Sequence, residues 1–209
     1  DAAWDGNYNS AGIHGLVDGN WVSVEDGEGE NDIPGIRDYI AVSIDPTNPN
    51  HVMFGSYEEG LIEVLDGEMV GLYNSSNSTI SEGNFGGSLR TGVSGVDFDK
   101  NGNLWFSNSF SDTPIQVRLT NGTFIPMDLG GAIGPTDNVA DLMVTRDGYV
   151  WVILPRGGGL LVFDPNGTPE ITTDDDWRFL STDLEEGNLP SNWVYSLEED
   201  LDGEIWVGT

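Results

Sequence analysis

The chain has 209 residues, of which 36 are acidic and only 7 are basic, so its formal charge is −29 at pH 7. A protein that binds nucleic acid needs a basic face to displace the counterions of the phosphates, and this charge therefore excludes nucleic acid as an expected partner. The absence of cysteine excludes disulfides, thiolate metal sites and cysteine nucleophiles, and no apolar run is long enough to predict a transmembrane helix.

The first predicted element is a pair of short strands within residues 1–26. The segment Gly12–Val24 contains apolar positions on both sides of an Asp-Gly pair. Asp-Gly is a typical two-residue turn between antiparallel strands. This segment matches only the outer half of the units that follow, so we predict an outer half-unit at residues 1–26.

Four short antiparallel strands are predicted in residues 36–75. An alternating strand at Ile40–Asp45 leads through a turn into an apolar strand at Asn50–Ser56, and a second apolar pair follows with its own turn. The same unit recurs further along the chain, at residues 92–128 and 138–181, and its inner half returns at residues 193–209.

One apolar position after the turn aligns the copies of this unit, and it is occupied by Met53, Trp105, Trp151 and Trp206. Three of the turns carry glycine at an equivalent place, as Gly102, Gly148 and Gly203. A four-stranded unit that recurs about every 50 residues is typical of the blades of a β-propeller. Helix signals are nearly absent, because Gly, Pro or Asn-Gly interrupts the apolar periods. We predict an all-β propeller with three complete blades between two half-blades, as part of a larger propeller.

The tryptophans divide into two groups. Those of the repeat are predicted to pack between blades, because they take one equivalent position in successive blades. The tryptophans outside this register are candidates for exposed contacts, namely Trp4, Trp21, Trp177 and Trp193. Arg156 is a further candidate ligand contact, because it lies in a glycine-rich strand connection and an isolated cation on an acidic surface can recognise carboxylate or phosphate. The alternative is that these are ordinary surface residues.

A calcium loop and a hairpin turn compete at Asp97–Gly102. The segment matches the first six positions of an EF-hand loop, but the twelfth position holds Asn108 in place of the required glutamate. The hairpin is favoured, because Asn-Gly adopts the positive φ angles that two-residue turns require. Asp174–Asp176 is a second acidic cluster, for which a solvated loop is favoured over a cation site. We predict no cofactor, with calcium as the alternative.

No catalytic residues are predicted. The two histidines, His14 and His51, lie in a strand-like stretch and a turn. Neither belongs to a nucleophile elbow, a zinc motif or an acid-histidine-nucleophile pattern. We therefore predict that the protein is not an enzyme.

The last unit, Val194–Thr209, resembles the two-component regulator propeller repeat, whose pattern is an apolar strand, an Asp-Gly turn and the phrase Ile-Trp-Val-Gly-Thr. The preceding blades resemble, in order, the propeller of PorZ-type proteins. Five phrases carry this resemblance: Ile44–Val52, Gly60–Val64, Gly102–Asn108, Leu154–Asp164 and Asn166–Pro169. PorZ-type proteins are surface components of the type IX secretion system of Bacteroidota.

The resemblance implies a non-enzymatic surface propeller that acts as a docking or glycan-binding platform in secretion and cargo attachment. The implied partners are other secretion-system surface proteins, or a surface lipopolysaccharide or other glycan, at the extracellular face of the outer membrane. Propellers of that family precede a secretion-signal domain, so the chain is expected to be an excerpt. Two alternatives stay open: the periplasmic oligosaccharide sensor of a hybrid two-component regulator, and a propeller glycosidase or lyase.

Overall fold

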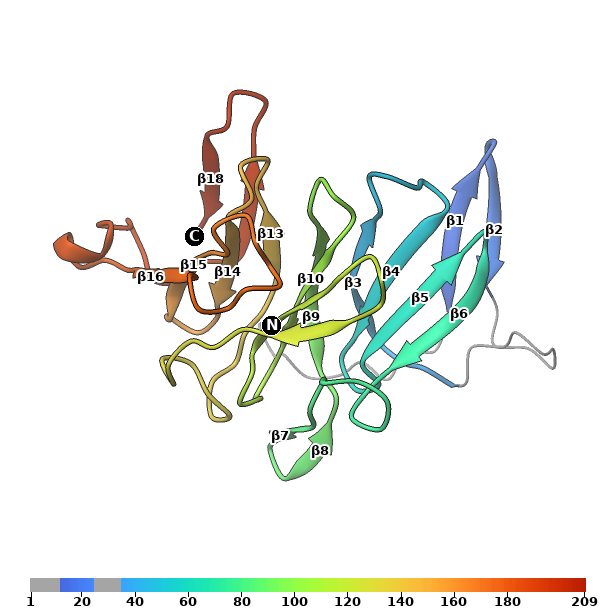
Figure 1. Ribbon diagram of the computed structural model, residues 1–209, viewed down its shortest axis with the longest axis horizontal. Helices are drawn as coiled ribbons and strands as arrows, with labels where there is room; N and C mark the ends of the chain where they lie inside the picture. The colour runs from blue at the N-terminus through green and yellow to red at the C-terminus, as the bar shows by residue number, and fades with distance from the viewer. Residues whose placement is uncertain (1–11, 25–34) are drawn as a thin grey trace.

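The computed structural model describes residues 12–24 and 35–209, and the regular secondary structure in them consists almost entirely of antiparallel strands (Figure 1). Of the predicted N-terminal half-blade, residues 1–11, which include Trp4, and residues 25–26 lie outside the described residues. The strands are β1 (Ile13–Val17), β2 (Asn20–Val24), β3 (Tyr39–Ile44), β4 (His51–Ser56), β5 (Leu61–Leu65), β6 (Glu68–Tyr73), β7 (Gly83–Phe85), β8 (Ser88–Arg90), β9 (Val93–Phe98), β10 (Leu104–Asn108), β11 (Ile115–Arg118), β12 (Phe124–Pro126), β13 (Leu142–Val144), β14 (Val150–Leu154), β15 (Gly159–Asp164), β16 (Asp176–Leu180), β17 (Ser196–Glu199) and β18 (Ile205–Gly208), with one short 3-10 helix, η1 (Leu184–Glu186).

The strands form three four-stranded sheets in which each strand pairs with the next along the chain. These sheets are β3 to β6, β9 to β12 and β13 to β16, and β1–β2 and β17–β18 are two-stranded sheets at either end of the series. Figure 1 shows the sheets side by side along the longest axis of the molecule. This is the architecture of consecutive propeller blades, and the all-β propeller prediction is confirmed. Within the described residues, no helix is long and apolar enough to cross a membrane.

The β7–β8 hairpin was not predicted. It lies between the first two four-stranded sheets in the chain and contributes a small sheet of its own (Figure 1). Its strands have three residues each, which is too short for an alternating pattern to be read from sequence. The ring of Phe85 fixes the hairpin to the body of the molecule, because it contacts Tyr57 at 5.5 Å and Phe110 at 4.6 Å between ring centroids.

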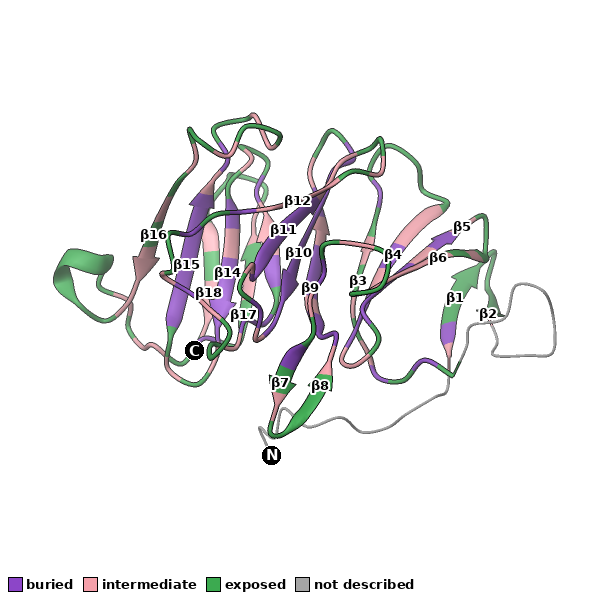
Figure 2. Cartoon of the chain, turned by 60° about the horizontal axis from the view of Figure 1, so that its bottom comes forward, coloured by how far each residue is buried: buried purple, intermediate pink, exposed green. Residues whose placement is uncertain are grey.

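The first strands of successive sheets lie beside one another and differ in how far they are buried. β9 packs against both β3 and β13, and residues on both of its faces are buried. A strand covered on one face only should alternate between covered and exposed residues, as β3 does. The exposed side chains of β3 are Ile40, Val42 and Ile44. Across the whole molecule, Figure 2 shows buried residues concentrated in the middle sheets and exposed residues in β1 and β2.

The turns between the first and second strands are held by side-chain oxygens. Asp99 Oδ1 accepts hydrogen bonds from the backbone N–H groups of Asn101 at 2.8 Å and Asn103 at 2.9 Å. Asp200 Oδ1 does the same for Asp202 and Glu204, at 2.9 and 3.0 Å. Such Asx turns need a residue at positive φ, and Gly102 and Gly203 supply it, at 84° and 86°. Asp99 and Asp200 therefore stabilise hairpin turns.

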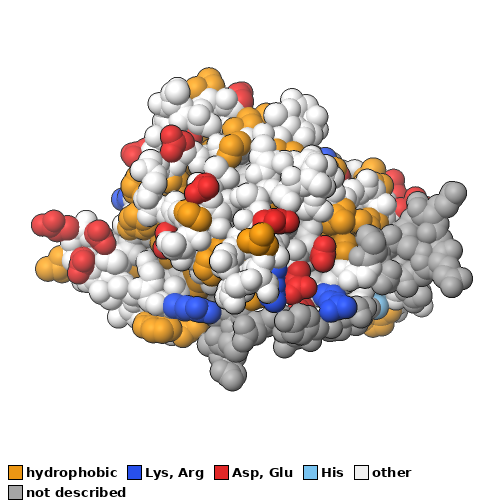
Figure 3. Space-filling model, turned by 90° about the horizontal axis from the view of Figure 1, so that it is seen from below, with side chains coloured by type: hydrophobic (Ala, Val, Ile, Leu, Met, Phe, Trp, Pro, Cys, Tyr) orange, Lys and Arg blue, Asp and Glu red, His pale blue; other side chains and the backbone are white. Residues whose placement is uncertain are grey.

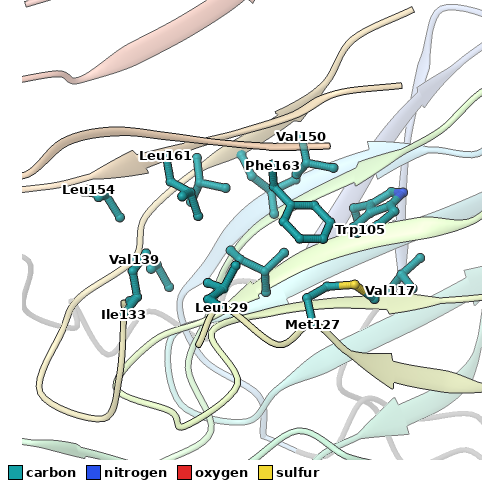
Figure 4. Packing of buried hydrophobic residues seen from close by; sticks show 13 residues of the cluster. Trp105, Val117, Met127, Leu129, Ile133, Val139, Val150, Leu154, Leu161 and Phe163 are labelled. Atoms are coloured by element: carbon teal, nitrogen blue, oxygen red, sulfur yellow. The ribbon is translucent and has the colours of Figure 1, made fainter. Parts of the chain in front are cut away.

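The largest apolar cluster lies between the second and third four-stranded sheets (Figure 4). Trp105 of β10 is 1% exposed, and its ring lies 5.8 Å from that of Phe163 of β15, measured between centroids. A second cluster, around Met53 and Phe106, joins the first and second sheets. Full burial of a side chain of this size contributes roughly 1.5–3 kcal/mol, so these clusters hold neighbouring sheets together.

The expected burial of the repeat tryptophans does not extend to the whole series. Met53 and Trp105 are buried, but Trp151 is only half-buried and Trp206 is 63% exposed. Trp206 differs because β17–β18 has two strands and no described sheet covers its far face. The indole Nε1 of Trp206 instead donates a hydrogen bond to Asp200 Oδ2 at 2.8 Å.

Candidate ligand-binding site

A cavity of about 280 Å³ opens among loops at one edge of the second and third sheets. Three connections contribute residues to it: the segment after β10, the long connection from β12 to β13, and the turn between β14 and β15. Phe179 of β16 completes the lining. The loop from β12 to β13 lies at the lower side of the molecule in Figure 1, which is the face turned to the viewer in Figure 3. Propeller loops of this kind are the usual place for binding residues, because the sheets hold them rigidly.

Two residues of this cavity have an unusual backbone conformation. Seven described non-glycine residues have positive φ, and five of them are Asp or Asn, which tolerate this region. The other two are Phe110, at 56°, and Arg156, at 61°, and both line the cavity. A left-handed conformation costs about 1–2 kcal/mol for such a side chain. Strain of this kind is characteristic of binding and catalytic sites.

Arg156 is exposed, and in the described part of the chain it makes no ion pair or hydrogen bond. Three other arginines are ion-paired with glutamates: Arg90 with Glu58, Arg118 with Glu63, and Arg146 with Glu199. An uncompensated guanidinium in a chain of charge −29 can attract an anionic group, so Arg156 stays a candidate ligand contact.

Polar groups of the β12–β13 connection face the same cavity. Asp137 Oδ2 accepts a hydrogen bond from the Gly134 N–H at 2.9 Å, which fixes its carboxylate within the loop. Asn138 Oδ1 accepts from Ser109 Oγ at 3.1 Å, which orients its side-chain amide. The cavity thus combines one cation with a carboxylate and an amide held in place by their own loops.

The structure brings Arg156 and Trp193 together and places Trp177 elsewhere. Trp193 is 53% exposed, and its ring lies 3.5 Å from the position that a Cβ on Gly157 would take, so it rests on the turn that carries Arg156. Trp177 is half-buried, with its ring 5.5 Å from that of Phe179, and it packs against the core between the second and third sheets.

Sequence reasoning did not identify Phe110, Asp137 or Phe179 as site residues. They lie on separate segments, and only the folding of those segments brings them into one cavity. Ser109-Phe110-Ser111 carries no motif, and nothing in the sequence marks Phe110 as a residue of positive φ. The glycine-rich connection around Arg156 was the one detectable signal.

The acids considered for calcium have other roles in the structure. Asp97 Oδ1 accepts a hydrogen bond from Ser43 Oγ at 3.1 Å, and Asp97 Oδ2 accepts one from the Val144 N–H at 2.8 Å. Burial raises the pKa of Asp97, and these hydrogen bonds partly oppose that rise. Asp97 therefore connects three neighbouring sheets. Among residues 12–24 and 35–209, no three acidic or histidine side chains are grouped as metal ligands.

The acidic loop before β16 contains a carboxylate in an unfavourable environment. The carboxylate oxygens of Asp175 are buried without a hydrogen-bond partner. Burial, together with the neighbouring charges of Asp174 and Asp164, raises its pKa to about 6. Asp174 Oδ2 accepts hydrogen bonds from Asn166 Nδ2 and Thr168 Oγ1, at 3.3 and 3.1 Å.

His51 is not arranged for acid-base catalysis. His51 has both ring nitrogens occupied, Nδ1 by Asp45 Oδ2 at 2.9 Å and Nε2 by Glu63 Oε1 at 2.8 Å. His14 Nδ1 lies 2.9 Å from Ser23 Oγ on an exposed hairpin. A general base needs a free nitrogen within reach of a substrate, and His51 has none.

Comparison with known proteins places this geometry in context. The family model described as two component regulator propeller matches residues 188–209. No curated protein matches the chain. The structure of PorZ, an essential bacterial surface component of the type IX secretion system of Porphyromonas gingivalis, is 25% identical, with a TM-score of 0.75. That match covers 98% of this chain and 29% of the PorZ chain.

Two further solved structures share the fold. The extracellular domain of the putative hybrid two component system BT4673 from B. thetaiotaomicron has a TM-score of 0.55 at 17% identity, covering 92% of this chain and 24% of that one. A catalytically inactive virginiamycin B lyase from Staphylococcus aureus, with quinupristin, has a TM-score of 0.58 at 12% identity. That match covers 91% of this chain and 53% of the lyase chain. The chain is therefore a β-propeller segment that carries a two-component regulator propeller repeat and resembles PorZ over nearly its whole length.

Proposed function

We propose that the chain is the propeller part of a non-enzymatic bacterial surface protein, a docking or glycan-binding platform in type IX secretion and cargo attachment. The observation that carries this proposal is the likeness to PorZ, which extends over 98% of the chain at 25% identity. The proposed location is the extracellular face of the outer membrane. The proposed partners are other secretion-system surface proteins or a surface lipopolysaccharide or other glycan.

The structure supports a binding role through the cavity at Arg156. Its lining comes from loops held by rigid sheets, and two of its residues, Phe110 and Arg156, keep strained backbones. The occupied nitrogens of His51 support a function without chemical turnover. We propose that no cofactor is needed, and calcium stays the alternative to be tested by titration.

A second candidate is the periplasmic ligand-sensing propeller of a hybrid two-component regulator. The observation that favours it is the match of residues 188–209 to the two-component regulator propeller. In this case the cavity residues would bind an oligosaccharide in the periplasm, and binding would alter transcription.

Disruption of the gene in the source bacterium separates the candidates. The docking proposal expects type IX cargo to be lost from the cell surface while the transcriptional response to polysaccharides is unchanged. A lost polysaccharide response with normal cargo would support the sensor instead. Turnover of any member of a polysaccharide panel by the purified protein would contradict both and support a glycosidase or lyase.

A further inference from the structure

The lining of the cavity combines apolar and polar side chains. Phe110, Ile133, Leu154 and Phe179 are apolar, and the polar members are Thr136, Asp137, Asn138 and Arg156, its one cationic residue. On the face shown in Figure 3, Lys and Arg side chains (blue) lie beside apolar side chains (orange). A carbohydrate site needs many directed polar groups for its hydroxyls, whereas an apolar pocket with a few polar groups suits a hydrophobic side chain. The lining therefore favours a ligand that is apolar with a single anionic end.

The size of the cavity points the same way. Its volume of about 280 Å³ lies just below the range of roughly 300–1,000 Å³ that is typical of small-molecule pockets. One amino-acid residue fits a space of this size better than an oligosaccharide does.

The charges in the cavity limit the ligand further. The guanidinium of Arg156 suits a carboxylate, which it can bind through two parallel hydrogen bonds. Asp137 lines the same cavity and repels ligands that carry several negative charges. Its carboxylate and the Asn138 side chain can accept hydrogen bonds from N–H groups. A ligand with one carboxylate, neighbouring N–H donors and an apolar side chain would match these groups. The C-terminal end of a polypeptide whose last residue is apolar has these three features.

We propose that this cavity binds the C-terminal residue of a partner polypeptide that ends in an apolar side chain. Arg156 holds the terminal carboxylate, the apolar lining takes the side chain, and Asp137 and Asn138 accept the preceding N–H groups. Trp193 is a positioning residue, because it packs on the turn that carries Arg156. This inference rests on the proposed docking function and names the chemistry of the partner.

The test compares two peptides that differ only at the end. The full chain is titrated with an acetylated tripeptide ending in leucine, either as the free carboxylate or as the carboxamide, and binding is followed by NMR chemical shifts. We expect the carboxamide to bind at least about tenfold more weakly, because it cannot form a charged pair with Arg156.

Two substitutions at one position keep the test independent of folding. Arg156→Gly removes the guanidinium and relieves the positive φ, so it is expected to fold at least as well and to lose about tenfold or more in affinity for the carboxylate peptide. Arg156→Gln should weaken binding similarly. The control is Arg178→Gln, because Arg178 is an exposed arginine that is next to Phe179 in β16 but does not line the cavity. It should change the affinity by less than about twofold.

Equal affinity for the carboxylate and carboxamide peptides would overturn the proposal, as would unchanged binding by Arg156→Gly. Binding of an oligogalacturonate that depends on Arg156, without binding of the peptide, would assign the cavity to acidic glycans instead. Either result leaves the docking function standing, because loss of surface cargo on gene disruption is measured separately.

Discussion

Glu63 Oε2 of β5 accepts a hydrogen bond from Arg118 Nη2 of β11 at 3.1 Å, and this contact joins the first and second four-stranded sheets. Tyr73 completes the group, since its hydroxyl donates to Glu63 Oε2 at 2.5 Å. The Arg118 guanidinium also lies over the Tyr73 ring, 5.1 Å from its centroid. The two sheets thus share a partly buried charged network in addition to their apolar contacts.

Replacing Arg118 by methionine is expected to lower the free energy of unfolding by about 2 kcal/mol, because it leaves the largely buried Glu63 with fewer partners. Urea denaturation followed by tryptophan fluorescence measures this. The comparison is Arg146→Met, which removes a contact between the third sheet and β17–β18: an ion pair whose arginine side chain is 54% exposed, and hydrogen bonds to the carbonyls of Asp200 and Leu201. Because it is exposed, this contact should cost at most about 1 kcal/mol. Equal losses in the two variants would show that burial of Glu63 does not strengthen the contact between the first and second sheets.

Tryptophans at equivalent positions of the repeat are expected to differ in their effect on stability. Trp105→Ala should destabilise the protein by about 3–5 kcal/mol, because it opens a cavity in the core between the second and third sheets. Trp206→Ala should cost about 1 kcal/mol, because it mainly removes one exposed hydrogen bond to Asp200. Thermal or chemical denaturation of the two variants measures both losses in the free energy of unfolding and shows whether they differ as expected. Similar losses would show that Trp206 is covered in solution.

Stability is expected to fall as the pH rises from about 4 to about 6, through the titration of Asp175. Its pKa is raised to about 6 in the folded protein, so the folded state binds more protons than the unfolded state in this window. Asp175→Asn should therefore raise the free energy of unfolding at pH 7 by about 1 kcal/mol, a value reduced for solvent screening. It should also flatten the pH profile of stability between these limits.

The control for this prediction is Asp112→Asn, at an exposed acidic residue of another loop. The free energy of unfolding is measured by denaturation at intervals from pH 4 to pH 7. Its dependence on pH should have the same slope in this variant as in the unaltered protein. A profile for Asp175→Asn that keeps the original slope would assign the pH dependence to other groups.

Arg156→Gly is expected to stabilise the protein by up to about 1 kcal/mol, because glycine adopts a φ of 61° without strain. Arg178→Gly, within β16, should have the opposite sign and destabilise by about 0.5–1 kcal/mol, because glycine weakens a strand. Differential scanning calorimetry of both variants provides the comparison. A destabilised Arg156→Gly would mean that the arginine side chain is retained for folding and not for binding.

The fold could be predicted from the sequence because of its repeat, whereas the cavity could not. Alternating strands, Asx-Gly turns and the recurring Trp position are local signals, and each copy reinforced the others. The exposure of Trp206 depends on which sheets flank β18, so the same residue at the same repeat position has a different environment from Trp105. Arg156 had a local signal in its glycine-rich turn. Phe110, Asp137 and Phe179 had none, because the cavity exists only where distant loops meet.

Asp97 also bears on how the molecule responds to mechanical load. The strand ladders lie within single sheets. One sheet is therefore tied to the next by a few backbone hydrogen bonds between loops, such as Thr91 N–H to Glu58 O, and by side chains such as that of Asp97, which reaches Ser43 on one side and Val144 on the other. Tension that separates neighbouring sheets would break these few bonds and the apolar contacts first, and the hydrogen-bonded ladders within each sheet would stay intact.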